Sequence, residues 1–230
     1  MINVDSLGNI QKSHNDQLNN YMIPISNVDW QFLHTVYSFN ERDTDVLSLI
    51  EKEDLVLFTF DGLKRRCGIH PETLSRILLR LEDEGIIKKS SKGYIVTPKI
   101  TKLKLNSVSK EEHTSTLLQT FLPSDLMTQQ VIDDLKGRWF GLLRWFGMSE
   151  NSRGVILKWV TDDGGIQIAA DIQGTALNIE AKFITNNNLN LALKAAYQLM
   201  NNISKLYQSS KAAKHTTAYF GNNSNYLPPA

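Results

Sequence analysis

Residues 63–76 decide the fold of the N-terminal half; they read Leu-Lys-Arg-Arg-Cys-Gly-Ile-His-Pro-Glu-Thr-Leu-Ser-Arg. Gly68 predicts the end of a short helix, because glycine readily takes the left-handed conformation that closes a helix. Pro71 follows three residues later and is a favoured first residue of a helix. Apolar side chains then recur at helical spacing until Gly85. The stretch therefore predicts two helices joined by a tight turn, the second over 71–84.

The flanking residues extend this pattern in both directions. A helix beginning after Asn40 or Thr44 and a short strand over 55–60 are expected before the pair, because apolar residues repeat there first at helical and then at strand spacing. After it, residues 86–89 and 94–97 are expected to form two strands joined by a polar turn. The predicted order is helix, strand, short helix, turn, helix and hairpin.

In this order, residues 45–100 resemble the winged helix-turn-helix domain of prokaryotic and archaeal transcription regulators of the MarR, ArsR and Lrp type. The resemblance is carried by the helix-Gly-Ile turn at Gly68-Ile69, and by Leu-Glu-Asp-Glu-Gly-Ile-Ile over 81–87 before a basic hairpin. It implies that helix 71–84 enters the major groove of DNA, with its N-terminal residues near base edges. It also implies that the hairpin over 88–94 reaches a flanking phosphate or the minor groove.

This placement predicts three groups of DNA contacts. Residues near base edges would be His70, Glu72, Thr73, Ser75 and Arg76. Residues at the phosphate backbone would be Arg80, Lys64 and Arg65, and the hairpin would add Lys88, Lys89, Ser91 and Lys92. Two alternatives stay open: Arg80 could pair with Glu84, four residues along the helix, and Arg66 could be a phosphate contact or a solvated surface residue.

Positive charge is concentrated in the same part of the chain. Residues 61–105 carry 11 Lys and Arg against 5 Asp and Glu, whereas the rest of the chain carries 14 against 19. The net charge of the whole sequence is only +1, so a uniformly basic protein is excluded but a basic face is not. Such a face attracts a polyanion.

The C-terminal half predicts a second domain over 124–208. A helix from Ser124 is expected to continue through Phe146, because apolar residues recur at helical spacing. Three strands follow over 155–161, 166–172 and 177–183; the last two alternate apolar and polar residues, which is typical of a sheet covered on one face. A closing helix is expected over about 188–207.

The predicted fold class is therefore α+β, a winged helix-turn-helix followed by an α-β-β-β-α domain with a three-stranded antiparallel sheet. The predicted segments are a flexible one over 1–27, the winged helix-turn-helix domain over 28–105, a helical connector over 106–123, the second domain over 124–208, and a flexible tail over 209–230.

Several function classes find no support in the sequence. The single cysteine, Cys67, excludes an internal disulfide and a cysteine-rich zinc site, and is expected to pack as a small buried side chain. No run of about 18 apolar residues and no apolar signal segment occurs, so we expect a cytoplasmic protein without a membrane partner. The histidines lack metal-ligand spacing, and no phosphate loop or nucleophile motif occurs. We expect no catalytic residue, metal or cofactor.

An unusual aromatic stretch over 137–147 leaves two interpretations open. Trp139, Trp145 and Trp159 could line a pocket for an aromatic effector, or these side chains could be core and dimer contacts.

The leading hypothesis is a DNA-binding transcription regulator that acts on double-stranded DNA as a homodimer, with a small-molecule effector or the transcription machinery as further partners. The alternative is a winged-helix protein-protein interaction module in a larger assembly. A third hypothesis is a regulator whose second domain holds an aromatic ligand.

Overall fold

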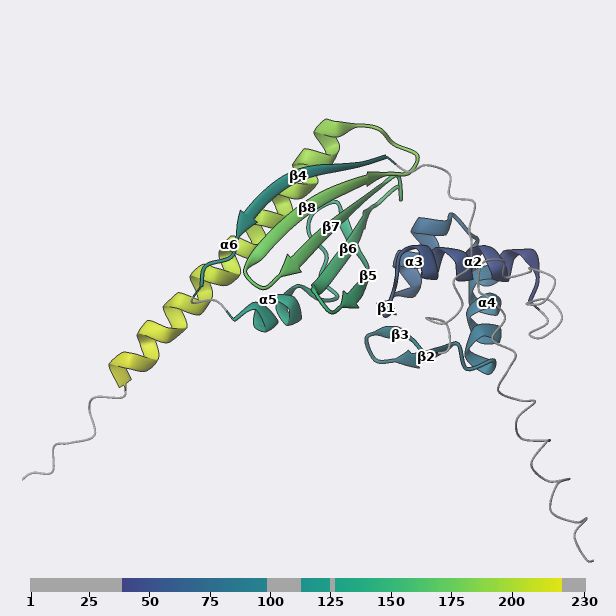
Figure 1. Cartoon of the computed structure of the whole chain (residues 1–230), viewed down its shortest axis with the longest axis horizontal. Helices are drawn as coiled ribbons and strands as arrows, with labels where there is room; N and C mark the ends of the chain where they lie inside the picture. Colours follow the sequence, from purple (N-terminus) through teal and green to yellow (C-terminus); the bar gives the residue numbers. More distant parts are fainter. Residues whose placement is uncertain (1–38, 99–112, 125–126, 221–230) are drawn as a thin grey trace, which may run out of the picture.

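The computed structural model describes residues 39–98, 113–124 and 127–220, and these build one antiparallel sheet with helices on both faces (Figure 1). The eight strands lie in the order β2-β3-β1-β5-β6-β7-β8-β4. Their bounds are β1 Leu57–Phe58, β2 Ile87–Ser90, β3 Gly93–Val96, β4 His113–Phe121, β5 Leu143–Asn151, β6 Gly154–Thr161, β7 Ile166–Gln173 and β8 Ala176–Phe183. The predicted fold class, with a separate three-stranded sheet after the winged helix, is therefore wrong.

The sheet is continuous because β1 pairs on both of its edges. Leu57 lies opposite Ile95 of β3 on one side and opposite Met148 of β5 on the other. Gly147 makes the second pairing possible, since a Cβ at this position would collide with the carbonyl oxygen of Leu57. The β2–β3 hairpin and the C-terminal strands consequently share one hydrogen-bonded sheet.

The N-terminal helices are α2 Glu41–Lys52, α3 Phe60–Cys67 and α4 Pro71–Asp83. Their order with β1, β2 and β3 agrees with the order predicted from the sequence, and Gly68 ends α3 with φ 65°. These helices surround a core of Leu, Ile and Phe side chains that also includes Phe146 of β5 and Val160 of β6. The N-terminal and C-terminal halves, which the sequence analysis assigned to separate domains, thus share core residues.

The C-terminal half buries its sheet under two helices. α5 Thr128–Leu135 and the long α6 Leu189–Phe220 pack on the same core as the apolar residues of β7, which are Ile166, Ile168, Ala170 and Ile172. In Figure 1, α6 crosses behind the sheet and extends well beyond it. The opposite face of the same strands carries Lys158, Gln167 and Lys182, and it is here that the N-terminal helices approach.

Three expected segments differ in the structure. Residues 113–121 of the expected helical connector form β4. The helix expected from Ser124 through Phe146 ends at Leu135, because Gly137 and Gly141 take φ values of 78° and 57° and turn the chain into β5. The expected tail is helical as far as Phe220. The segments over 1–27 and 221–230 lie outside the described residues.

Candidate nucleic-acid interface

The α3–α4 pair is positioned by its caps. The Thr59 hydroxyl accepts a hydrogen bond from the Gly62 amide at 3.2 Å and donates to the Trp145 carbonyl oxygen at 3.0 Å. It therefore begins α3 and also ties the helix to β5. His70 precedes α4, is exposed, and leaves its side chain out of the cap. The residues at the start of α4 therefore lie at the surface.

The outer face of α4 is open to solvent. Glu72, Ser75 and Arg76 are exposed, and Thr73 is half-buried. Arg76 pairs with Glu72 at 2.6 Å, with their side chains 70% and 66% exposed. Ion pairs of this exposed i,i+4 kind contribute only about 0.3–0.5 kcal/mol. A phosphate or a base edge could replace Glu72 as the partner of Arg76 at small cost.

Arg80 has a partner that the sequence did not predict. Its guanidinium forms an ion pair with Asp43, whose side chain is fully buried at the start of α2. Asp43 also accepts the amide of Asn40 at 2.9 Å in a capping box. Arg80 thus neutralises a buried carboxylate and joins α4 to α2. The ion pair of Arg80 is thus with Asp43 and not with Glu84, and the Arg80 side chain remains 40% exposed, so the phosphate contact stays a prediction.

The β2–β3 hairpin carries lysine side chains that are exposed and form no ion pair within the described residues. Its exposed polar residues are Lys88, Lys89, Ser91 and Lys92. The Ser90 hydroxyl fixes the turn by donating to the Gly93 carbonyl oxygen at 2.9 Å and accepting the Lys92 amide at 3.3 Å. Within the described residues, the three lysine side chains form no ion pair. Their ammonium groups are therefore available to an anion in solution.

In contrast to the hairpin lysines, Lys64 and Arg65 of α3 both contact a carboxylate. Lys64 pairs with Asp61 at 3.1 Å, and Arg65 lies 3.9 Å from the same carboxylate. The Arg65 guanidinium also lies 5.9 Å from the ring centre of Trp139. Both remain at the surface, so they can still face a polyanion, but Asp61 offsets one of the two charges. Lys99, Lys102 and Lys104, which contribute to the charge of this region, lie outside the described residues.

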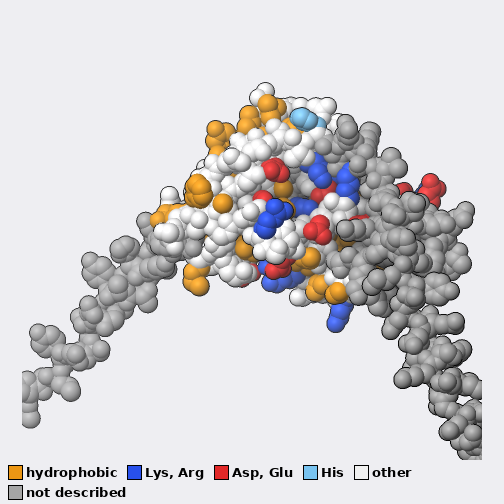
Figure 2. Space-filling view, viewed as in Figure 1, with side chains coloured by type: hydrophobic (Ala, Val, Ile, Leu, Met, Phe, Trp, Pro, Cys, Tyr) orange, Lys and Arg blue, Asp and Glu red, His pale blue; other side chains and the backbone are white. Residues whose placement is uncertain are grey.

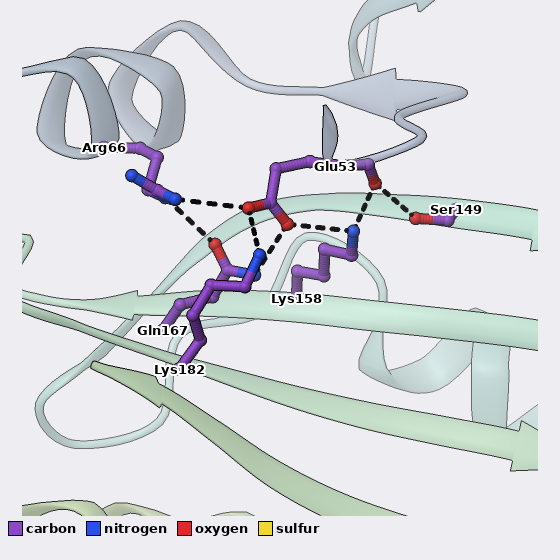
Figure 3. Close-up of polar contacts among 6 residues, drawn as sticks. All are labelled: Glu53, Arg66, Ser149, Lys158, Gln167 and Lys182. Atoms are coloured by element: carbon purple, nitrogen blue, oxygen red, sulfur yellow. Dashed lines mark hydrogen bonds and ion pairs between the residues drawn. The ribbon is translucent and has the colours of Figure 1, made fainter. Parts of the chain in front are cut away.

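Arg66 is neither a surface residue nor a phosphate contact, because it belongs to a buried polar cluster around Glu53 (Figure 3). The Glu53 carboxylate lies 3.2 Å from Arg66, 3.1 Å from Lys158 and 2.7 Å from Lys182. It also accepts the Gln167 amide at 2.8 Å. The cluster joins the end of α2 and the last turn of α3 to three strands of the C-terminal sheet.

Electrostatics within this cluster keep Glu53 ionised. Burial alone disfavours the carboxylate, but the charges of Lys158 and Lys182 and the hydrogen bonds from Lys182 and Gln167 outweigh it, so the pKa of Glu53 lies far below its usual value. Burial lowers the pKa of Lys158 despite the opposing charge of Glu53. The cluster is therefore a buried set of ion pairs and hydrogen bonds that joins the N-terminal helices to the C-terminal strands.

The three tryptophans do not line one cavity. Trp145 and Trp159 are 2% and 0% exposed and meet edge to face at 5.3 Å between ring centres. Trp139 is 56% exposed and lies under the Arg144 guanidinium at 4.8 Å. The structure thus favours the core interpretation for two of them. Trp145 does border a cleft of about 480 Å3, together with Thr59, Asp61, Lys92 and Lys136.

Sequence reasoning did not single out Glu53, Lys158, Gln167 and Lys182. A signal was present, since Lys158 interrupts the apolar run Val-Ile-Leu-Lys-Trp-Val and Gln167 lies between two isoleucines. A charged residue within a buried strand requires a partner, because an unpaired buried charge is costly. The partner itself, far away in the sequence, could not be identified without the fold.

Comparison with family models, with curated proteins and with solved structures found no match to this chain. Within the described residues, no group of three or more His, Cys, Asp or Glu side chains is arranged to hold a metal ion. No helix among them has both the length and the apolar character needed to cross a membrane.

Proposed function

We propose that this chain is a transcription regulator that binds double-stranded DNA through the outer face of α4 and the β2–β3 hairpin. The observation that carries the proposal is a set of three exposed lysines, Lys88, Lys89 and Lys92, which form no ion pair in the described part of the chain and lie on a hairpin that packs beside α4. The Lys89 amide donates to Glu82 of α4 at 3.0 Å, so the hairpin and the helix are held together.

In this proposal α4 would contact bases and the β2–β3 hairpin would contact phosphates. An α-helix fits the major groove, where Arg76 can form two hydrogen bonds to a guanine and Glu72 can accept one from a cytosine amino group. The hairpin lysines would contact phosphates and would not distinguish one base from another. Their contacts would fix the orientation of the helix on the duplex. Each phosphate contact releases counterions and steepens the fall of log K with log salt by about 0.9. Three lysine contacts would therefore steepen this slope by about 2.7.

Titration of a labelled random duplex with the full chain, followed by fluorescence anisotropy at two salt concentrations, tests the proposal. We expect binding at low salt that weakens as salt rises. The double variant Lys88→Gln/Lys92→Gln should weaken binding, whereas Arg153→Gln/Lys194→Gln, which removes the same charge from exposed positions elsewhere, should bind like the wild type. Absence of binding at low salt, or equal loss in both variants, would refute the proposal.

One observation favours protein docking as a second candidate function. Leu79, on the exposed side of α4, is 59% exposed, so its side chain is open to an apolar contact with a partner protein. A partner protein would cover Leu79, so Leu79→Gln should abolish capture of that partner but leave duplex affinity unchanged. Co-purification that survives nuclease treatment and disappears in Leu79→Gln would support docking over DNA binding.

A further inference from the structure

The outermost strand of the sheet has one open edge. β4 pairs with β8 only, within the described residues. The Leu122 amide donates to Thr175 on the β8 side at 2.7 Å. Because backbone groups alternate in direction along an antiparallel strand, the amides of Leu118 and Thr120 also point to β8, and those of Gln119 and Phe121 point outward. In the part of the chain that the structure describes, no strand is present to bond these outward groups.

Few of the features that normally protect an edge are present in β4. Its nine residues, His-Thr-Ser-Thr-Leu-Leu-Gln-Thr-Phe, include no proline, lysine, arginine or acidic residue. The opposite edge of the sheet differs, since β2 has only four residues and two of them are Lys88 and Lys89. Short, charged edges resist further pairing, and long, uncharged ones invite it. A bulge between Thr116 and Leu118 interrupts β4 but leaves 118–121 regular.

An apolar surface continues from this edge onto α6. A groove of about 320 Å3 lies between β4 and α6, and its apolar lining comes from Leu117, Leu118, Leu193, Ala196, Tyr197 and Met200. Tyr197 is 70% exposed, and Phe121 at the end of β4 is 77% exposed. In Figure 2, hydrophobic side chains gather on the side of the molecule formed by β4 and α6, and the visible charged side chains lie mainly elsewhere.

We propose that a second copy of this chain occupies this surface, with β4 of each copy pairing antiparallel around a two-fold axis. The strand can pair with itself because, among residues 114–121, no side chain is charged, so the axis brings no like charges together. If the two-fold axis is perpendicular to the sheet, the same face of the sheet points in the same direction in both copies. The two α6 helices would therefore lie on one face, where their grooves meet and bury Tyr197 and Met200.

The same symmetry places the N-terminal helices of both copies on the other face, at opposite ends of the joined sheet. Both α4 helices would then be presented to one side. This assembly does not depend on DNA binding and would exist in its absence, so its test and the test of the proposed function are separate.

The proposal is tested with the full chain by light scattering after size-exclusion chromatography over a range of concentrations. The wild type should have twice the mass of one chain. Gln119→Pro removes an outward amide and no bond to β8, so it should give a folded monomer. A wild type that stays monomeric at about 100 µM, where even a micromolar dimer would be largely associated, would overturn the proposal.

A second variant covers the case in which proline disturbs the strand. Gln119→Lys adds a positive charge to the strand segment that pairs with its own copy, so two like charges are brought near the axis, and the substitution should raise the dimer dissociation constant at least tenfold. Gln173→Lys adds the same charge at the exposed end of β7 and should leave the dimer intact. A dimer that tolerates both Gln119 variants would be formed by another surface, and the proposal would be wrong.

Discussion

Replacement of Glu53 by glutamine should strongly destabilise the protein. The carboxylate is 1% exposed, and its three cationic neighbours lie within 3.2 Å, with the side chains of Arg66 and Lys158 only 6% and 8% exposed. Glutamine has nearly the same shape but no charge, so the buried Lys158 would lose its ion-pair partner and Arg66 would lose its contact with this carboxylate. Removing one partner of a buried pair costs about 3–5 kcal/mol.

Thermal unfolding followed by circular dichroism, and urea denaturation, measure this cost. At about 2–4 °C per kcal/mol for a chain of this length, the melting temperature should fall by about 6–20 °C. Glu150→Gln, the same substitution at an exposed position of β5, should change stability by less than about 0.5 kcal/mol.

A second substitution separates lost charge balance from lost packing. In the Glu53→Gln background, Lys158→Met removes the buried cation whose ion-pair partner is gone and should restore part of the stability. A Glu53→Gln variant that loses less than about 1 kcal/mol, or a double variant that is additive, would refute the view that charge balance around Glu53 joins the two halves.

Three further predictions follow from the same contacts. Because the folded-state pKa of Glu53 is lowered, its contribution to stability is complete above its unfolded value of about 4.5 and is lost as pH falls, so Glu53→Gln should flatten the acid-unfolding curve between about pH 5 and pH 2. Burial raises the pKa of Cys67 to about 12, so iodoacetamide should modify it at least a hundredfold more slowly in the folded protein than in urea; similar rates would count against its burial. Gly147→Ala should lower the melting temperature by several degrees, because the new methyl group collides with the Leu57 carbonyl oxygen, and an unchanged melting temperature would show that β1 and β5 do not pair.

The sequence predicted the N-terminal elements well because their signals are local. Gly68 needs a left-handed backbone, Pro71 begins a helix, and the apolar stripe of α4 repeats within 13 residues. Capping and periodicity act over a few residues, so they can be recognised without knowledge of the fold. The exposed positions of Glu72, Ser75 and Arg76 on α4 follow from that periodicity.

The features that the sequence did not predict depend on contacts between residues far apart in the chain. β5 is buried on both faces over most of its length, so its apolar residues lack the alternation of a half-exposed strand and resemble a helix. β4 forms only because β8 supplies its hydrogen bonds. The partners of Arg66 and Arg80, which are Glu53 and Asp43, lie 13 and 37 residues away, and only the fold brings them together.

The salt dependence of duplex binding tests the central claim most directly, because it counts phosphate contacts. The dissociation constant of one duplex is measured at several salt concentrations for the wild type and for Lys88→Gln/Lys92→Gln. At about 0.9 per contact, the slope of log K against log salt should become shallower by about 1.8 in the variant. Equal slopes for the two proteins would show that the hairpin lysines do not contact DNA and would contradict the account.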